Sequence, residues 1–90
     1  MGKTNISDMT FGERLQHYAT AKRITVGTIH QIINGEFKRF YVGKLRGRIV
    51  SRPGDNQYKF ESEEEAYLAA SAFRQDAKKL LADTMAALSI

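Results

Sequence analysis

The sequence predicts a small α+β fold, on three observations. Apolar residues recur with helical spacing before residue 22 and again after residue 62. Between these two segments, from Phe40, apolar and basic residues alternate with the period of two that is typical of β-strands. The length of 90 residues fits one domain. We therefore expect a single unit with a helical N-terminal part, a β-hairpin after it and a long C-terminal helix.

The first helix is predicted from a local signal at its start. Thr10 precedes Phe11, and Glu13 follows three residues later, which is the pattern of a capping box. The helix should run to about Lys22. Residues 1–9 are polar and show no periodic pattern, so we expect them to form a flexible N-terminal arm.

The segment from Ile24 to Gly35 decides the fold. As a helix over residues 25–34, it places Val26, Ile29 and Ile33 on one apolar stripe, which Asn34-Gly35 would end. As a strand, it has apolar residues on both faces. Asn34-Gly35 is, however, also the preferred two-residue turn of a β-hairpin. The number of matching positions favours the helix, and the strand stays open as the alternative.

A basic β-hairpin is predicted over residues 40–60. Apolar residues at one parity alternate with basic residues at the other, and Arg52–Asn56 provides a turn before a return strand over 57–61. The apolar positions are Tyr41, Leu45 and Ile49. The basic positions are Lys44, Arg46, Arg48 and Arg52.

The C-terminal helix is predicted over residues 62–88, beginning with a second capping box at Ser62 and Glu65. Such a helix is longer than the core of a domain this small can cover. Its distal apolar residues, Leu81, Met85 and Leu88, are therefore candidates for dimerisation. The alternative is a helix that folds back over its own sheet.

The charge is concentrated in the middle of the chain. Residues 22–59 hold nine basic and two acidic side chains, a net charge of +7, whereas residues 60–90 carry −3 and the whole chain +4. A basic region joined to an acidic helix is the pattern expected of a nucleic-acid-binding module with an assembly element.

Several other classes of function find no support in the composition. The chain has no cysteine, and its two histidines, His17 and His30, have no carboxylate at the spacing of metal ligands. No nucleophile–base pair or phosphate loop can be assembled, so we expect neither an enzyme nor a cofactor, metal or small-molecule substrate. The absence of a long apolar run argues against membrane insertion and favours a cytoplasmic protein.

Two helices followed by a basic hairpin form a winged helix-turn-helix, with residues 10–61 as the DNA-binding domain and 62–90 as the packing helix. The run from Ile24 to Phe37, followed by Val42-Gly43 and Arg48-Ile49, resembles excisionase/MerR-like winged-helix domains. This resemblance implies a recognition helix over 25–34 in the major groove and a wing on the backbone. It also implies a phage or mobile-element regulator.

The predicted DNA contacts form two sets. Base readout is expected from Gly27, Thr28, Gln31 and Asn34, because Gln and Asn can pair with adenine and Thr can contact a base edge. Backbone contacts are expected from Thr25, His30, Lys38, Arg39, Lys44, Arg46, Arg48 and Arg52.

We therefore expect a sequence-specific double-stranded DNA-binding protein that acts in transcription regulation or as a recombination directionality factor. Its long C-terminal helix makes a homodimer one expected form. One alternative is also a DNA-binding protein, but its fold consists of three strands and a helix, with Asn34-Gly35 as the hairpin turn. In support, residues 60–66 resemble the strand-to-helix step of integrase arm-binding and plant ethylene-response-type domains. The other alternative is a phage-type adaptor or inhibitor that binds a host protein through helix 62–88.

Overall fold

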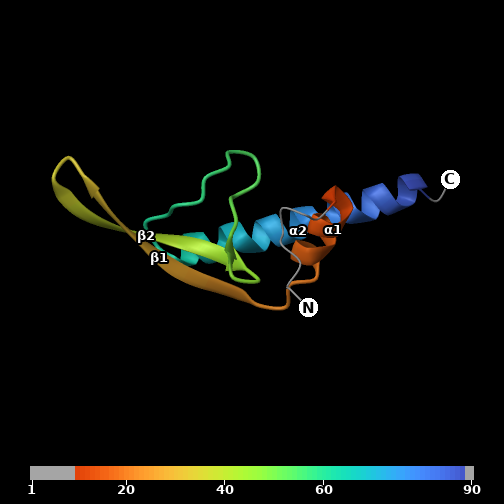
Figure 1. Cartoon of the computed structure of the whole chain (residues 1–90), viewed down its shortest axis with the longest axis horizontal. Coiled ribbons are helices and arrows are strands. Elements are labelled where there is room, and N and C mark those ends of the chain that lie inside the picture. Colours follow the sequence, from red (N-terminus) through yellow and green to blue (C-terminus); the bar gives the residue numbers. More distant parts are fainter. Residues whose placement is uncertain (1–9, 89–90) are drawn as a thin grey trace.

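The computed structural model describes residues 10–88, which form two helices and one three-stranded antiparallel sheet (Figure 1). The elements in chain order are α1 (Phe11–Ala19), β1 (Ile24–Ile33), β2 (Glu36–Leu45), β3 (Arg48–Ile49) and α2 (Glu63–Leu88). The predicted α+β class is confirmed. The predicted arm over residues 1–9 lies outside the described residues.

Helix α1 begins where the capping box predicts. The Thr10 hydroxyl accepts a hydrogen bond from the Glu13 backbone N–H at 3.2 Å, and the Glu13 carboxylate accepts from the Thr10 hydroxyl at 3.0 Å. At the other end, the Thr20 hydroxyl donates to the carbonyl of Gln16. The helix ends at Ala19, about one turn earlier than predicted, with Thr20 as its C-cap.

The helix predicted over residues 25–34 is wrong, because this segment is strand β1. It pairs with β2 along its whole length, from Ile24 opposite Leu45 to Ile33 opposite Glu36. Asn34 and Gly35, which join the strands, both have positive φ, of 52° and 78°. Two left-handed residues make the turn that matches the twist of a hairpin, and Asn-Gly adopts it at little cost. The three-stranded sheet of the alternative interpretation is the observed one.

The predicted hairpin over residues 40–60 differs from the observed strands. Arg46 and Gly47 form a second turn of left-handed residues, with φ of 51° and 77°, and reverse the chain into the short strand β3. This reversal places Ile49 opposite Lys44, on the face away from Leu45, so the predicted common face of Leu45 and Ile49 is wrong.

Of the predicted return strand over residues 57–61, only Phe60 pairs with the sheet. It exchanges two backbone hydrogen bonds with Tyr41, at 2.8 and 2.9 Å. The preceding turn is present, since the Asn56 N–H donates to the Arg52 carbonyl at 3.0 Å. The segment between β3 and α2 is therefore a loop fixed to β2 at its end.

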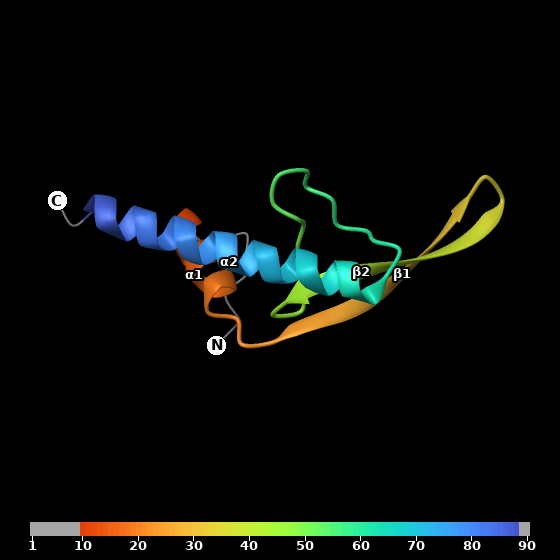
Figure 2. The same ribbon diagram turned by 180° about the vertical axis from the view of Figure 1, so that it is seen from behind.

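Helix α2 covers one face of the sheet (Figure 2). Its contact residues are small: Ala66, Ala69 and Ala70 are fully buried. Opposite them stands Gly43, where a Cβ atom would lie 2.3 Å from the carbonyl oxygen of Ala66. The absence of a side chain at this position is what lets the helix and β2 come so close.

Helix α1 packs against the distal part of α2. Leu15 and Ala19 are buried with Ala77, and Leu81 is partly buried against the same cluster. Next to it, the Tyr18 ring meets Phe73 edge to face, with ring centroids 5.2 Å apart. Together with the alanines under the sheet, the α2 residues in these contacts form the inward face of that helix.

The two faces of the sheet follow from the strand register, because cross-strand partners share a face. The sheet residues in the helix clusters lie on one face, which we call the helix-side face: Ile24, Val26, Tyr41, Leu45 and Val50. The opposite face, which no described helix covers, we call the open face. Its β1 and β2 members are Thr25, Gly27, Ile29, Gln31, Ile33, Glu36, Lys38, Phe40, Val42 and Lys44.

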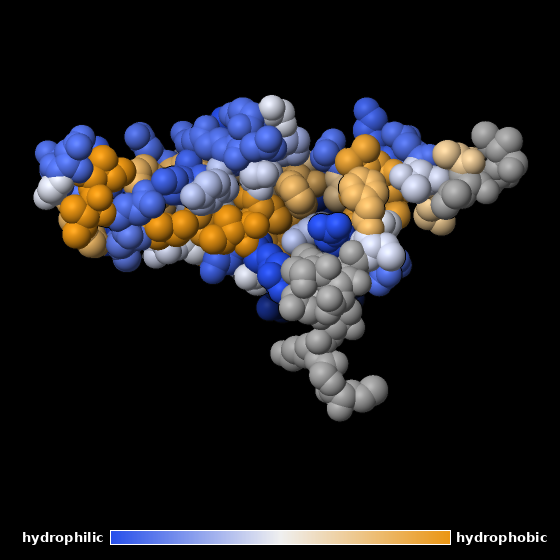
Figure 3. Space-filling view, turned by 45° about the horizontal axis from the view of Figure 1, so that its top comes forward, coloured by the Kyte–Doolittle hydropathy of each residue, from blue (hydrophilic) through white to orange (hydrophobic). Residues whose placement is uncertain are grey.

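We call the whole β1–β2 hairpin the ribbon. Its far half extends beyond the start of α2 (Figure 1). Burial along β2 falls from Leu45, which is fully buried, to the residues next to the turn, which are exposed. At the tip, Ile32 is 75% exposed and its partner Phe37 69% exposed. Apolar surface gathers there, at the left of Figure 3.

Candidate nucleic-acid interface

The open face is positively charged. Lys38 and Lys44 belong to this face, and Lys59 reaches it from the loop beside β2. Among its β1 and β2 members, the only acidic residue is Glu36, at the turn. The other side of the molecule carries the exposed carboxylates of the first turn of α2, Glu63, Glu64 and Glu65. The electrostatic field therefore favours an anionic partner on the open face.

Gln31 is held between two lysines on this face. The Lys59 ammonium donates a hydrogen bond to Oε1 of Gln31 at 2.8 Å and lies over the Phe40 ring, 5.2 Å from its centroid. Lys38 is the cross-strand partner of Gln31. The carboxamide is thus oriented through its oxygen, while its NH₂ group stays available as a donor of two hydrogen bonds.

Lys44 lies across β1 rather than away from the sheet. A Cβ atom at Gly27 would meet its Cε at 2.9 Å and its Nζ at 3.1 Å. Because Gly27 has no side chain, the Lys44 side chain can lie over it, which puts its positive charge above β1 near the base of the ribbon.

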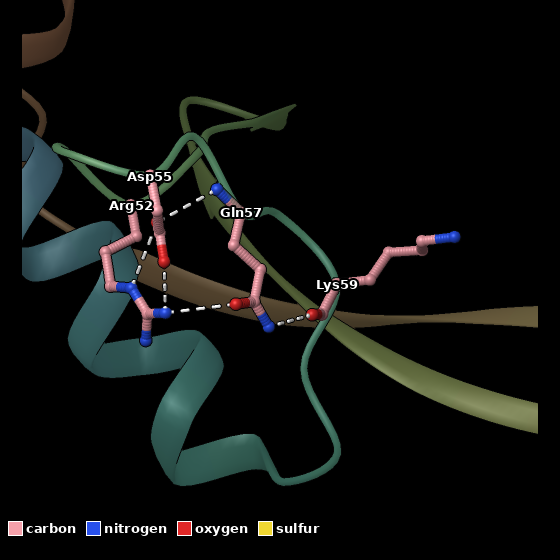
Figure 4. Close-up of polar contacts among 4 residues, drawn as sticks. All are labelled: Arg52, Asp55, Gln57 and Lys59. Carbon is pink, nitrogen blue, oxygen red and sulfur yellow. Dashed lines mark hydrogen bonds and ion pairs between the residues drawn. The ribbon is translucent and has the colours of Figure 1, made fainter.

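The position of Lys59 is set by a polar network in the loop (Figure 4). The Arg52 guanidinium binds both carboxylate oxygens of Asp55 and also donates to Oε1 of Gln57 at 3.0 Å. The Gln57 amide in turn donates to the Lys59 carbonyl at 2.9 Å. Arg52 lowers the pKa of Asp55 below its usual range, chiefly through their hydrogen bonds. This network fixes the loop and leaves the Lys59 side chain pointing away from it.

Lys59 is absent from the predicted contacts. The signal that marks it is its neighbour Phe60, which pairs with β2 and packs against α2, while the Lys59 side chain reaches Gln31 on the open face. Arg52, which is among the predicted backbone contacts, is instead paired with Asp55 in the single ion pair found within residues 10–88.

The remaining predicted contacts divide between the two faces. Successive residues of a strand point to opposite faces of the sheet, so residues predicted on one face of a helix are divided between the two faces. Thr25, Gly27, Gln31, Lys38 and Lys44 share the open face. Thr28, His30 and Arg39 lie on the helix-side face, where the His30 ring stacks on Phe37 with centroids 5.1 Å apart. Asn34 occupies the hairpin turn.

Arg46 is bound to the end of α1. Its Nε donates to the His17 carbonyl at 2.7 Å, and its Nη2 donates to the Thr20 hydroxyl at 3.2 Å. A cation at this place complements the negative end of the helix dipole. Arg48 is exposed on β3, next to this turn.

The predicted dimerisation residues have different environments. Leu81 is partly buried within the chain's own core, against Leu15, Ala19 and Ala77. Met85 is 61% exposed. The side chain of Leu88 lies outside the described part of the chain. For Leu81, the structure thus shows a helix that packs on its own domain.

His17 makes stability depend on pH. Partial burial, followed by the charges of Arg46 and Arg48, lowers its pKa below 6.5. Protonation is thus harder in the folded than in the unfolded chain, so this contribution to stability is complete above about pH 6.5 and is lost as the pH falls through the lower, folded pKa. We expect the free energy of unfolding, measured with urea, to decrease between pH 7.5 and 5.5, and the decrease to be smaller in His17→Gln.

Arg48→Gln is the matched control for that measurement. It removes one of the two charges that act on His17, so it should reduce the pH dependence without abolishing it. Identical pH profiles for the wild type and His17→Gln would contradict the assignment.

The described residues contain no group of three or more His, Cys, Asp or Glu side chains arranged to hold a metal ion. Neither α1 nor α2 combines the length and the apolar character needed to cross a bilayer. Compared with protein-family models, with curated proteins and with solved structures, the chain gives no match in any of the three.

Proposed function

We propose that the protein binds double-stranded DNA by placing the open face of the ribbon in the major groove. The observation that carries this proposal is Gln31, held between Lys38 and Lys59 on a positively charged sheet face that no described helix covers. A glutamine amide pairs with the major-groove edge of adenine, and lysines bind the flanking phosphates.

The dimensions of the ribbon support this placement. The major groove is about 12 Å wide and admits a two-stranded β-ribbon. Lys38 and Lys44 stand six positions apart on β2, which corresponds to about 20 Å of extended chain. Their ammonium groups can therefore reach the phosphates on both sides of the groove, while Gly27, Ile29 and Gln31 on β1 face the bases.

A DNA-reading surface of this kind suits roles in which binding is itself the activity. We infer that the chain acts as a sequence-specific transcription regulator or as a recombination directionality factor. Both roles need recognition of a short duplex site, and a single ribbon provides it. A homodimer that binds two half-sites is compatible with this proposal.

The experiment compares two double variants that lose the same charge. Lys38→Ala with Lys44→Ala removes two cations from the open face, whereas Lys78→Ala with Lys79→Ala removes two exposed cations from α2. Affinity for a labelled duplex is measured by fluorescence anisotropy over a range of salt concentrations. The slope of log K against log salt should fall by about 1.8 for the first pair, at about 0.9 per lost phosphate contact.

The α2 pair should keep the slope of the wild type, because its lysines lie away from the ribbon. An equal reduction by both pairs would show that total charge, rather than the open face, attracts the duplex. That result would overturn the proposed interface.

A further inference from the structure

A second basic site lies at the base of the ribbon. The connection from α1 to β1 and the β2–β3 turn enclose a hollow of about 370 Å³. Three cations line it, Lys22 and Arg23 from the connection and Arg46 from the turn, together with Ala21, Thr25 and Gly47. The fold thus brings together three positive charges from two segments that are far apart in the sequence.

Within residues 10–88, no carboxylate neutralises these cations, since the one ion pair there joins Arg52 to Asp55. Glu13 borders the neighbouring hollow with Arg46, but its carboxylate accepts hydrogen bonds from Thr10 in the α1 cap. Like charges held around one hollow repel each other, and an anion that enters it removes this repulsion.

The Arg46 side chain is already ordered for such a ligand. Its two bonds to His17 and Thr20 hold the guanidinium in place and leave three of its five N–H donors unused. A guanidinium binds phosphate oxygens in a fixed geometry, and a side chain that is ordered beforehand loses little entropy on binding. At Gly47, a Cβ atom would meet nothing within 4 Å, so the backbone of the turn is open to a ligand.

We propose that this hollow binds a phosphate group, either a phosphodiester of the DNA backbone or a free phosphate. If the phosphate belongs to the DNA backbone, this proposal rests on the proposed function. Thr25 lines the hollow and is also the cross-strand partner of Lys44 on the open face. The hollow therefore continues the cationic surface of the ribbon past its base, on the side where one wall of the major groove would lie.

The first experiment uses inorganic phosphate and does not involve DNA. Phosphate is titrated into the ¹⁵N-labelled protein, with sodium chloride of equal ionic strength as the reference. We expect saturable amide shifts at residues 22–25 and 46–47. The shifts should disappear in Lys22→Gln with Arg23→Gln and persist in Lys78→Gln with Lys79→Gln. The hollow variant leaves Arg46 and its contacts with α1 intact.

The second experiment measures the salt dependence of duplex binding with the same two variants. A slope lowered by about one in the Lys22/Arg23 variant alone identifies the ligand as a DNA phosphate. Saturable phosphate shifts with an unchanged slope identify it as free phosphate. If phosphate gives no saturable shift and the slope is also unchanged, the proposal is overturned. The Lys38/Lys44 variant tests the ribbon separately, so failure of one site is distinguishable from failure of the other.

Discussion

Gly43→Ala is expected to destabilise the protein by about 3 kcal/mol, at the upper end of the usual cost of overpacking. The added Cβ would lie 2.3 Å from the Ala66 carbonyl oxygen and 2.7 Å from the Cβ of Ala70. The first of these is a backbone atom, so no change of rotamer relieves the clash. Helix α2 must move away from β2, which exposes the alanines it buries.

The matched control is Gly12→Ala in α1, where an added Cβ would meet nothing within 4 Å. Alanine is the better residue within a helix by about 0.5–1 kcal/mol, so this variant should be stabilised. Urea unfolding of both variants measures the difference. Similar small effects at both positions would contradict the close contact between α2 and β2.

Phe60→Ala is expected to cost about 3–5 kcal/mol, the usual range for truncating a buried phenylalanine. Phe60 is 1% exposed and packs with Ala66 and Ala69 of α2. It also ends the loop that positions Lys59, so its loss should weaken the proposed DNA binding as well as folding. The lysine can then no longer be held beside Gln31.

Tyr58→Ala provides the comparison for Phe60, since Tyr58 is in the same loop but 43% exposed. We expect it to change the free energy of unfolding by about 0.5 kcal/mol, as is usual at the surface. Equal losses for the two variants in thermal or urea unfolding would mean that the loop, rather than the buried ring, carries the stability.

The helix starts could be predicted from the sequence because their signals are local. Thr10 with Glu13, and Ser62 with the Glu65 N–H at 3.1 Å, act within four residues and need no knowledge of the remaining chain. Similarly, Asn34-Gly35 carried the correct hairpin signal, since turn geometry depends on the two residues that form it.

The strand over residues 24–33 could not be predicted from apolar spacing, because its apolar residues do not all serve the core. Beyond the start of α2 no helix covers either face of the ribbon within the described chain, and Ile32 and Ile33 remain exposed. Periodicity predicts structure correctly where apolar residues are buried together. On a projecting ribbon this condition fails, and a helical spacing arises without a helix.

For the proposed interface, the sequence shows that basic residues are concentrated in residues 22–59 but not how the structure distributes these cations. Lys38 and Lys44 belong to the open face, whereas Arg46 lies at the base of the ribbon, bound to the end of α1. That contact joins residues 29 positions apart and has no sequence signal. The partner of Arg52 is only three residues away, so Asp55 could have been recognised from spacing alone.

The burial gradient along β2 has a mechanical consequence. Local opening costs least free energy where few apolar contacts must break, so the tip of the ribbon should open far more readily than the segment under α2. The ribbon is therefore expected to be flexible at its tip and rigid at its base, where α2 covers it. Groove width and twist vary with DNA sequence. In the proposed complex, a compliant tip would follow this variation, while the rigid base would keep a constant alignment with the phosphate backbone.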